Sequence, residues 1–156
     1  MEESLISRYK EALKLKDMDA DIYSPLVLAY IGDAIYELVI RTKVVNHGNT
    51  QVNKLHKRTA ALVKAEAQAR LYMLLEDELT EEEKAVYRRG RNSKTTTMAK
   101  NATMKDYRMA TGFEALMGWL YLKGSMDRLV ELVASGLSKA GCLDGGEKET
   151  EGKTGI

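Results

Sequence analysis

Residues 24–43 read SPLVLAYIGDAIYELVIRTK, a stretch that is apolar on nearly every side of the helix it predicts. Ser24 followed by Pro25 is a strong helix start, with the serine as N-cap and the proline in the first turn. A helix that is apolar all round belongs in the middle of a bundle rather than on its surface. We therefore expect this helix to lie inside the fold.

The rest of the chain is also predicted to be helical. Residues 106–123, DYRMATGFEALMGWLYLK, form a second helix that is apolar on most sides. Amphipathic or capped helices are expected over 4–16, 51–75, 80–89 and 125–137, the third of them starting with a capping box at Thr80 and Glu83. There is one proline, and the valines and isoleucines do not alternate with polar residues as in a half-buried strand. The sequence predicts an all-α fold.

The length of 156 residues suits one domain with additional ends. We expect an amphipathic helix and linker over 1–20, the main domain over 21–140, and a disordered tail over 141–156 that has almost nothing to bury. The single cysteine, Cys142, cannot form an internal disulfide. The start MEESLISRYK lacks the apolar core of a signal peptide, and no apolar stretch is long enough to span a membrane. These features predict a cytoplasmic protein without membrane contact.

Charge is segregated along the chain although the net charge is only +1. Residues 76–83 contain six acidic and no basic residues, whereas 84–108 contain eight basic residues and one acid, Asp106. The stretch 90–104, GRNSKTTTMAKNATM, is predicted to be a loop, and loops of this length tend to be functional or disordered. A basic loop can bind a nucleic-acid backbone. The alternative is a solvated connector.

Two carboxylates stand among apolar neighbours in the two most apolar helices. Neither Asp33 nor Glu114 has a Lys or Arg three or four residues away. Burial of an unpaired carboxylate is costly, and two carboxylates from crossing helices can hold Mg²⁺ with several waters retained. Gly32 and Gly118 would allow these helices to approach closely. The alternative is that both carboxylates reach water at the rim of the bundle.

The same residues carry a family resemblance. Residues 30–38, YIGDAIYEL, resemble the ribonuclease III signature with its metal-binding aspartate, and 113–122, FEALMGWLYL, resemble the second motif of that family. Residues 60–63, AALV, are similar to a segment between the two motifs. The similarity covers about 24–137. It implies a homodimeric helical endonuclease that cleaves double-stranded RNA, with Asp33 and Glu114 as catalytic, Mg²⁺-binding residues.

Two departures from the family pattern point to one branch of the family. The first is that Ala29 and Thr111 stand where ribonuclease III has further acids, so the number of metal ions at the site, one or two, stays open. The chain is also too short for a C-terminal RNA-binding domain. This combination, with 53–57 and 89–92, resembles Mini-ribonuclease III, the bacterial form that keeps only the catalytic domain. The resemblance implies maturation of the precursor of large-subunit (23S) ribosomal RNA.

Contact with RNA is expected from the end of the 80–89 helix and the following loop. The predicted RNA-binding residues are Arg89, Arg91, Asn92, Lys94, Lys100 and Lys105.

Glu37, one turn after Asp33, is expected to have a structural role. The N-terminal helix could pack across a dimer or against a ribosomal protein or the pre-ribosome. The alternative function is a non-catalytic double-stranded-RNA-binding ribosome-assembly factor on the same scaffold. A helical nucleotide hydrolase is a weaker rival, because the only acidic cluster in a predicted helix is the Glu81-Glu82-Glu83 cap, which is expected to be exposed.

Overall fold

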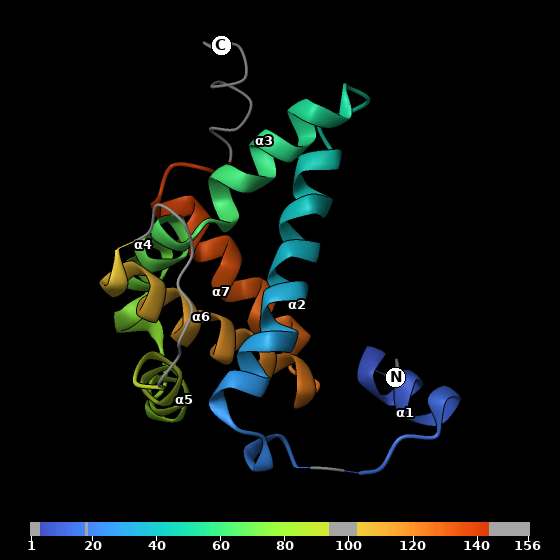
Figure 1. Ribbon diagram of the computed structural model, residues 1–156. Helices are drawn as coiled ribbons and strands as arrows, with labels where there is room; N and C mark the ends of the chain where they lie inside the picture. The colour runs from blue at the N-terminus through green and yellow to red at the C-terminus, as the bar shows by residue number, and fades with distance from the viewer. Residues whose placement is uncertain (1–3, 18, 94–102, 144–156) are drawn as a thin grey trace.

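The computed structural model describes residues 4–17, 19–93 and 103–143, and these residues form helices and no strand (Figure 1). The predicted all-α class is therefore confirmed. The elements in chain order are α1 (Leu5–Leu13), the 3-10 helix η1 (Ala20–Ile22), α2 (Pro25–Val45), α3 (Val52–Val63), α4 (Ala65–Leu75), the 3-10 helix η2 (Glu76–Glu78), α5 (Glu81–Arg91), α6 (Met104–Leu122) and α7 (Met126–Lys139).

Side-chain caps fix where several helices begin. The Ser24 hydroxyl accepts a hydrogen bond from the amide of Val27, with Pro25 in the first turn of α2. At the start of α5, the Thr80 hydroxyl accepts from the amide of Glu83, and the Glu83 carboxylate accepts from the amide of Thr80. Both predicted helix starts are confirmed.

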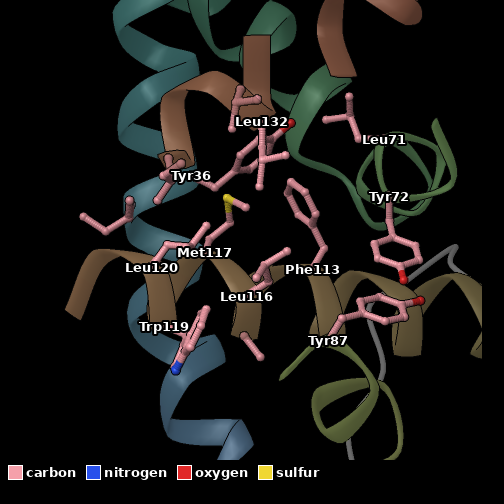
Figure 2. Packing of buried hydrophobic residues seen from close by; sticks show 14 of the residues in the cluster. Tyr36, Leu71, Tyr72, Tyr87, Phe113, Leu116, Met117, Trp119, Leu120 and Leu132 are labelled. Carbon is pink, nitrogen blue, oxygen red and sulfur yellow. The ribbon is translucent and has the colours of Figure 1, made fainter. Parts of the chain in front are cut away.

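Helix α6 forms the centre of the fold, between α2, α5, α4 and α7 (Figure 1). From Met109 to Tyr121 every residue except Glu114 is buried. Figure 2 shows Phe113, Leu116 and Met117 of α6 within the cluster of buried side chains. The rings of Phe113 and Tyr36 meet edge to face, with their centroids 5.2 Å apart, which ties α6 to α2. The single interruption of this buried stretch is therefore a carboxylate.

Helix α2 differs from its prediction, because only one side of it faces the core. Its buried residues include Leu28, Tyr36 and Ile40. The opposite side leaves large apolar side chains exposed: Leu26 at 43%, Val27 at 47%, Tyr30 at 81%, Leu38 at 55% and Val45 at 59%. An apolar sequence pattern indicates that a helix surface is suited to burial, but it does not indicate whether the same chain or another molecule covers that surface. We call this set the α2 outer face.

The helix predicted over 51–75 is two helices. Lys64 is extended, with φ −67° and ψ 160°, and it is both the C-cap of α3 and the N-cap of α4. The break leaves the carbonyl of Val63 without a partner from the next turn, and the side chain of Gln68 donates a hydrogen bond to it at 2.8 Å. Neither glycine nor proline marks the break, so the sequence pattern did not reveal it.

The N-terminal helix α1 has no buried residue, and its Ile6 lies against Gly124 after α6.

Among the described helices none combines the length and apolar character needed to cross a bilayer. The predicted loop residues 94–102 and most of the predicted tail, 144–156, lie outside the described residues.

Candidate active site

Two glycines let α2 and α6 cross with their backbones in contact. A β-carbon on Gly32 would stand 1.8 Å from the carbonyl oxygen of Glu114, and one on Gly118 would stand 2.0 Å from the carbonyl oxygen of Leu28. No side chain fits at either position. Since Asp33 follows Gly32 directly, this crossing brings the two carboxylate-bearing turns together.

The two carboxylates are less buried than predicted, and to different degrees. Asp33 is exposed on α2, whereas Glu114 is partly buried on α6. Burial raises the pKa of the Glu114 carboxyl to about 8. A hydrogen bond from Gln68 lowers this pKa, whereas the charge of Asp33 and a hydrogen bond with Asp33 raise it further. The carboxyls therefore lie close enough to interact directly. Of the two alternatives drawn from the sequence, Asp33 follows the one in which the carboxylate reaches water, and Glu114 lies between the two.

Gln68 of α4 is the third member of this site. Its side chain is 2% exposed, and its amide nitrogen donates hydrogen bonds to Glu114 Oε2 at 3.0 Å and to the Val63 carbonyl at 2.8 Å. Its Oε1 has no hydrogen-bond partner within the described structure. Sequence reasoning missed this residue; the available signal was an amide beside the apolar stripe of the 51–75 stretch.

The other acids near the site do not join the pair. Glu37, one turn after Asp33, accepts a hydrogen bond from Arg41 at 2.8 Å and lines a surface hollow on α2 with Asp33 and Tyr30. The positions of the two missing acids are buried: Ala29 is 7% exposed, and Thr111 donates to the carbonyl of Tyr107 at 3.0 Å.

The donor set fits a hydrated magnesium ion better than a metal held only by protein atoms. Across residues 4–17, 19–93 and 103–143 there is no group of three or more His, Cys, Asp or Glu side chains that could hold a metal. Mg²⁺ commonly uses one or two carboxylates and keeps several waters. Asp33 and Glu114 supply two carboxylates that repel each other, which is a pair that a divalent cation would stabilise.

Basic residues flank the site at the end of α5. A β-carbon on Gly90 would stand 2.8 Å from the Ala115 β-carbon and 2.9 Å from the Gly112 α-carbon, so the last turn of α5 packs on α6 beside Glu114. This turn carries Arg88, Arg89 and Arg91.

The six predicted RNA-binding residues divide into three groups. Arg89, Arg91 and Asn92 lie at the end of α5, which extends two residues further than predicted. Lys105 is exposed in the first turn of α6. Lys94 and Lys100 lie outside the described residues.

Comparison with known families defines the class of this fold and site. The model of the ribonuclease III domain matches residues 26–125, more than half of the chain, and this range includes α2 apart from its first residue, the Asp33–Glu114 pair and α6. The chain belongs to the ribonuclease III domain family.

Within that family, the chain is similar to the proteins called Mini-ribonuclease 3. The protein of this name from Clostridium tetani is 53% identical over 111 residues, which are 70% of this chain and 74% of that protein. The one from Enterococcus faecalis is 51% identical over 118 residues, 74% of this chain and 89% of that protein. The resemblance predicted from the two motifs is confirmed.

A solved structure supports the same fold. The crystal structure of a protein from Fusobacterium nucleatum superposes with a TM-score of 0.69 at 33% identity, and the match covers 75% of this chain and 95% of that one.

Proposed function

We propose that this chain cleaves double-stranded RNA by metal-assisted phosphodiester hydrolysis, with Asp33 and Glu114 as the ligands of Mg²⁺. Membership of the ribonuclease III family supplies the reaction class, endonucleolytic cleavage of RNA. The observation that carries the assignment of residues is the interaction of the two carboxyls at the glycine-lined crossing of α2 and α6.

In this proposal the residues of the chain divide the work. Asp33 and Glu114 hold the ion, and their fixed backbones keep its position constant because the helices that carry them are in contact. A bound Mg²⁺ would supply an activated water and stabilise the charge that builds up on the phosphate. Gln68 fixes one oxygen of Glu114. Exposed Asp33 gives the site access to a large substrate.

The proposed grip on RNA comes from the last turn of α5 and the first turn of α6. A-form RNA offers phosphates and 2′-hydroxyls rather than readable base edges in its narrow major groove. Arg89, Arg91 and Lys105 suit phosphates, and Asn92 suits hydroxyl groups; Lys94 and Lys100 belong to the same proposal from sequence alone. Binding by a few phosphate contacts should be modest and strongly salt-dependent.

We further propose a homodimer that uses the α2 outer face. Contiguous exposed apolar surface on a helix is a common sign of a protein interface. The family resemblance implies a dimer, and the α2 outer face, with Tyr30 at 81% exposure, is the surface on this chain that suits it. Tyr30 and Asp33 line the same hollow, so a dimer formed here would have its interface next to the site.

The proposed cellular function is maturation of the precursor of 23S ribosomal RNA in the cytoplasm, with the pre-ribosome or a ribosomal protein as partner. The N-terminal helix would pack against such a partner or across the dimer. The proposed cellular function rests on the similarity to Mini-ribonuclease 3. The alternative is a non-catalytic RNA-binding assembly factor, favoured by the apolar and hydroxyl residues at Ala29 and Thr111. The retained pair Asp33 and Glu114, with like charges held side by side at a free-energy cost, argues for the enzyme.

The test is cleavage of a long perfect RNA duplex and of a ribosomal precursor by purified full-length protein, with Mg²⁺ or with chelator. Asp33→Ala and Glu114→Ala should abolish cleavage, whereas Glu66→Ala, which removes an exposed acid from α4 two residues before Gln68, should leave it intact. Binding of both RNAs by the native chain without cutting would establish the assembly-factor alternative.

A further inference from the structure

The buried side chain of Gln68 makes two hydrogen bonds, to the Val63 carbonyl and to Glu114, at a position where an apolar side chain would also fit the fold. It lies one turn into α4, and α4 packs against α6. Its side chain is 2% exposed and spans the gap between the end of α3 and Glu114, which is 46 residues away in sequence. An apolar side chain of similar length would fill this volume without bringing an amide into the interior.

The orientation of the Gln68 amide follows from its neighbours. Both partners of Nε2, the Val63 carbonyl and Glu114 Oε2, are acceptors. A reversed amide would direct an oxygen at both acceptors, so the nitrogen must face them. The amide oxygen is thereby turned away and left without a partner among the described residues. A buried acceptor without a partner lowers stability, which is a cost that packing does not explain.

We propose that Gln68 is a positioning residue for the metal site: its amide nitrogen fixes Glu114 Oε2, so that the remaining carboxylate oxygen is directed to the ion shared with Asp33. This inference rests on the proposed function. Groups that hydrogen-bond to metal ligands orient them, and their loss typically lowers metal affinity or activity about 10–100-fold. Gln68 touches Glu114 rather than the substrate, so it acts through the ligand.

The purely structural reading is that Gln68 only caps the broken end of α3. The chain contains a matched control for this reading. The Tyr36 hydroxyl donates to the carbonyl of Leu62 at 2.7 Å, next to the carbonyl that Gln68 caps, and it has no hydrogen bond to Glu114. Tyr36→Phe therefore removes a buried hydrogen bond to the same end of α3 while leaving the Glu114 contact in place.

The experiment compares the wild-type chain, Gln68→Met and Tyr36→Phe, using three measurements on the full-length protein. Mg²⁺ affinity is measured by calorimetry without RNA, thermal stability in chelator, and kcat and KM on an RNA duplex. Gln68→Met should weaken Mg²⁺ binding about tenfold or more and lower kcat with little change in KM. Tyr36→Phe should lower the melting temperature but keep the wild-type metal affinity.

Wild-type Mg²⁺ affinity and kcat in a folded Gln68→Met protein would overturn the inference. If Gln68→Met does not melt cooperatively, Gln68→Asn takes its place, because it keeps an amide that is one methylene too short to reach both acceptors. Failure of the proposed function looks different: the wild-type chain itself would bind Mg²⁺ no better than Glu114→Ala and would not cut the duplex. Wild-type binding and cutting with unaffected Gln68 variants would reject only the role of Gln68.

Discussion

The α-carbon of Gly32 lies directly against the backbone carbonyl of Glu114, so closely that a β-carbon at position 32 would stand 1.8 Å from that oxygen. The backbone of Glu114, one proposed metal ligand, is thus in contact with Gly32, which directly precedes Asp33, the other proposed ligand. The spacing of the two carboxylates depends on the closeness of the helices, and this closeness depends on the absence of a side chain at Gly32.

Gly32→Ala should force α2 and α6 apart and lower both stability and activity. The β-carbon would meet backbone, which cannot move aside as a side chain can, so we expect a loss of about 3 kcal/mol or more in the free energy of unfolding. Urea denaturation and duplex cleavage check this. Gly136→Ala in α7 is the matched control, since its β-carbon would meet a movable side-chain end, Leu71 Cδ2, at 2.6 Å. Equal effects of the two substitutions would contradict the account.

Metal-free protein should lose stability as the pH rises from about 4.5 to about 8. The pKa of Glu114 is raised to about 8 in the folded protein, from an ordinary value of 4.5, so within this window the folded state binds more protons than the unfolded state. The free energy of unfolding therefore falls with rising pH. Glu114→Gln removes this dependence and should stabilise the metal-free protein at pH 8 by an amount on the order of 1–3 kcal/mol.

Thermal melts across this pH range in chelator provide the measurement. Added Mg²⁺ should raise the melting temperature of the wild-type chain at pH 8 and leave that of Glu114→Gln unchanged. A flat pH profile for the wild-type chain, or an equal response of both proteins to Mg²⁺, would count against the paired site.

Arg128→Met should destabilise the fold without changing the chemistry. The Arg128 guanidinium donates two hydrogen bonds of 2.9 Å to the buried Glu83 carboxylate, joining α7 to α5, and these bonds hold the pKa of Glu83 below its usual range. Loss of one partner of a buried pair typically costs roughly 3–5 kcal/mol, and the 27% exposure of the Arg128 side chain reduces the expected loss to about 2–3 kcal/mol.

The pH dependence of this effect has a definite sign. Because the folded pKa of Glu83 is depressed, the pair stabilises the protein above the unfolded pKa and loses this contribution as the pH falls through the folded pKa. The difference in urea stability between wild type and Arg128→Met should therefore shrink in acid. A difference that persists unchanged at low pH would show that the pair acts through packing alone.

Leu38→Glu should convert the proposed dimer into a monomer. It places a charge in the α2 outer face, where Leu38 is 55% exposed. Sedimentation velocity gives the oligomeric state. Val130→Glu is the control, because Val130 is similarly exposed at 47% but lies on α7. A wild-type chain that is monomeric at high concentration, or a Leu38→Glu variant that remains dimeric, would refute the placement of the interface.

Arg89→Ala and Lys105→Ala should weaken RNA binding with little effect on kcat. Each lost phosphate contact reduces the slope of log affinity against log salt by about 1. Binding titrations on a duplex at several salt concentrations test this. Lys16→Ala, in the linker after α1, should leave the slope unchanged. Identical slopes for all the variants would remove these residues from the interface.

The helices that are marked by apolar residues or by a local cap could be predicted from the sequence. Residues 24–43 and 106–123 are apolar around most of their circumference, and the capping box at Thr80 joins residues three apart. Such features depend on neighbours in the chain. The two family motifs also identify Asp33 and Glu114 as site residues from the sequence alone.

The features that depend on distant contacts could not be predicted. The break at Lys64 follows from packing rather than from glycine or proline, and the exposure of Asp33 depends on which side of α2 faces α6. Gln68 reaches Glu114 only because α4 packs on α6. No sequence pattern joins residues that are 46 positions apart through a side-chain hydrogen bond.

The most direct test of the central claim separates binding from cleavage. Complexes of a labelled RNA duplex with wild type, Asp33→Asn or Glu114→Gln are formed in chelator, and the reaction is started with excess Mg²⁺. We predict that all three proteins bind the duplex and that only the wild-type chain cuts it within a single turnover. Cleavage at the wild-type rate by either variant would contradict the assignment of Asp33 and Glu114 as the metal-holding pair.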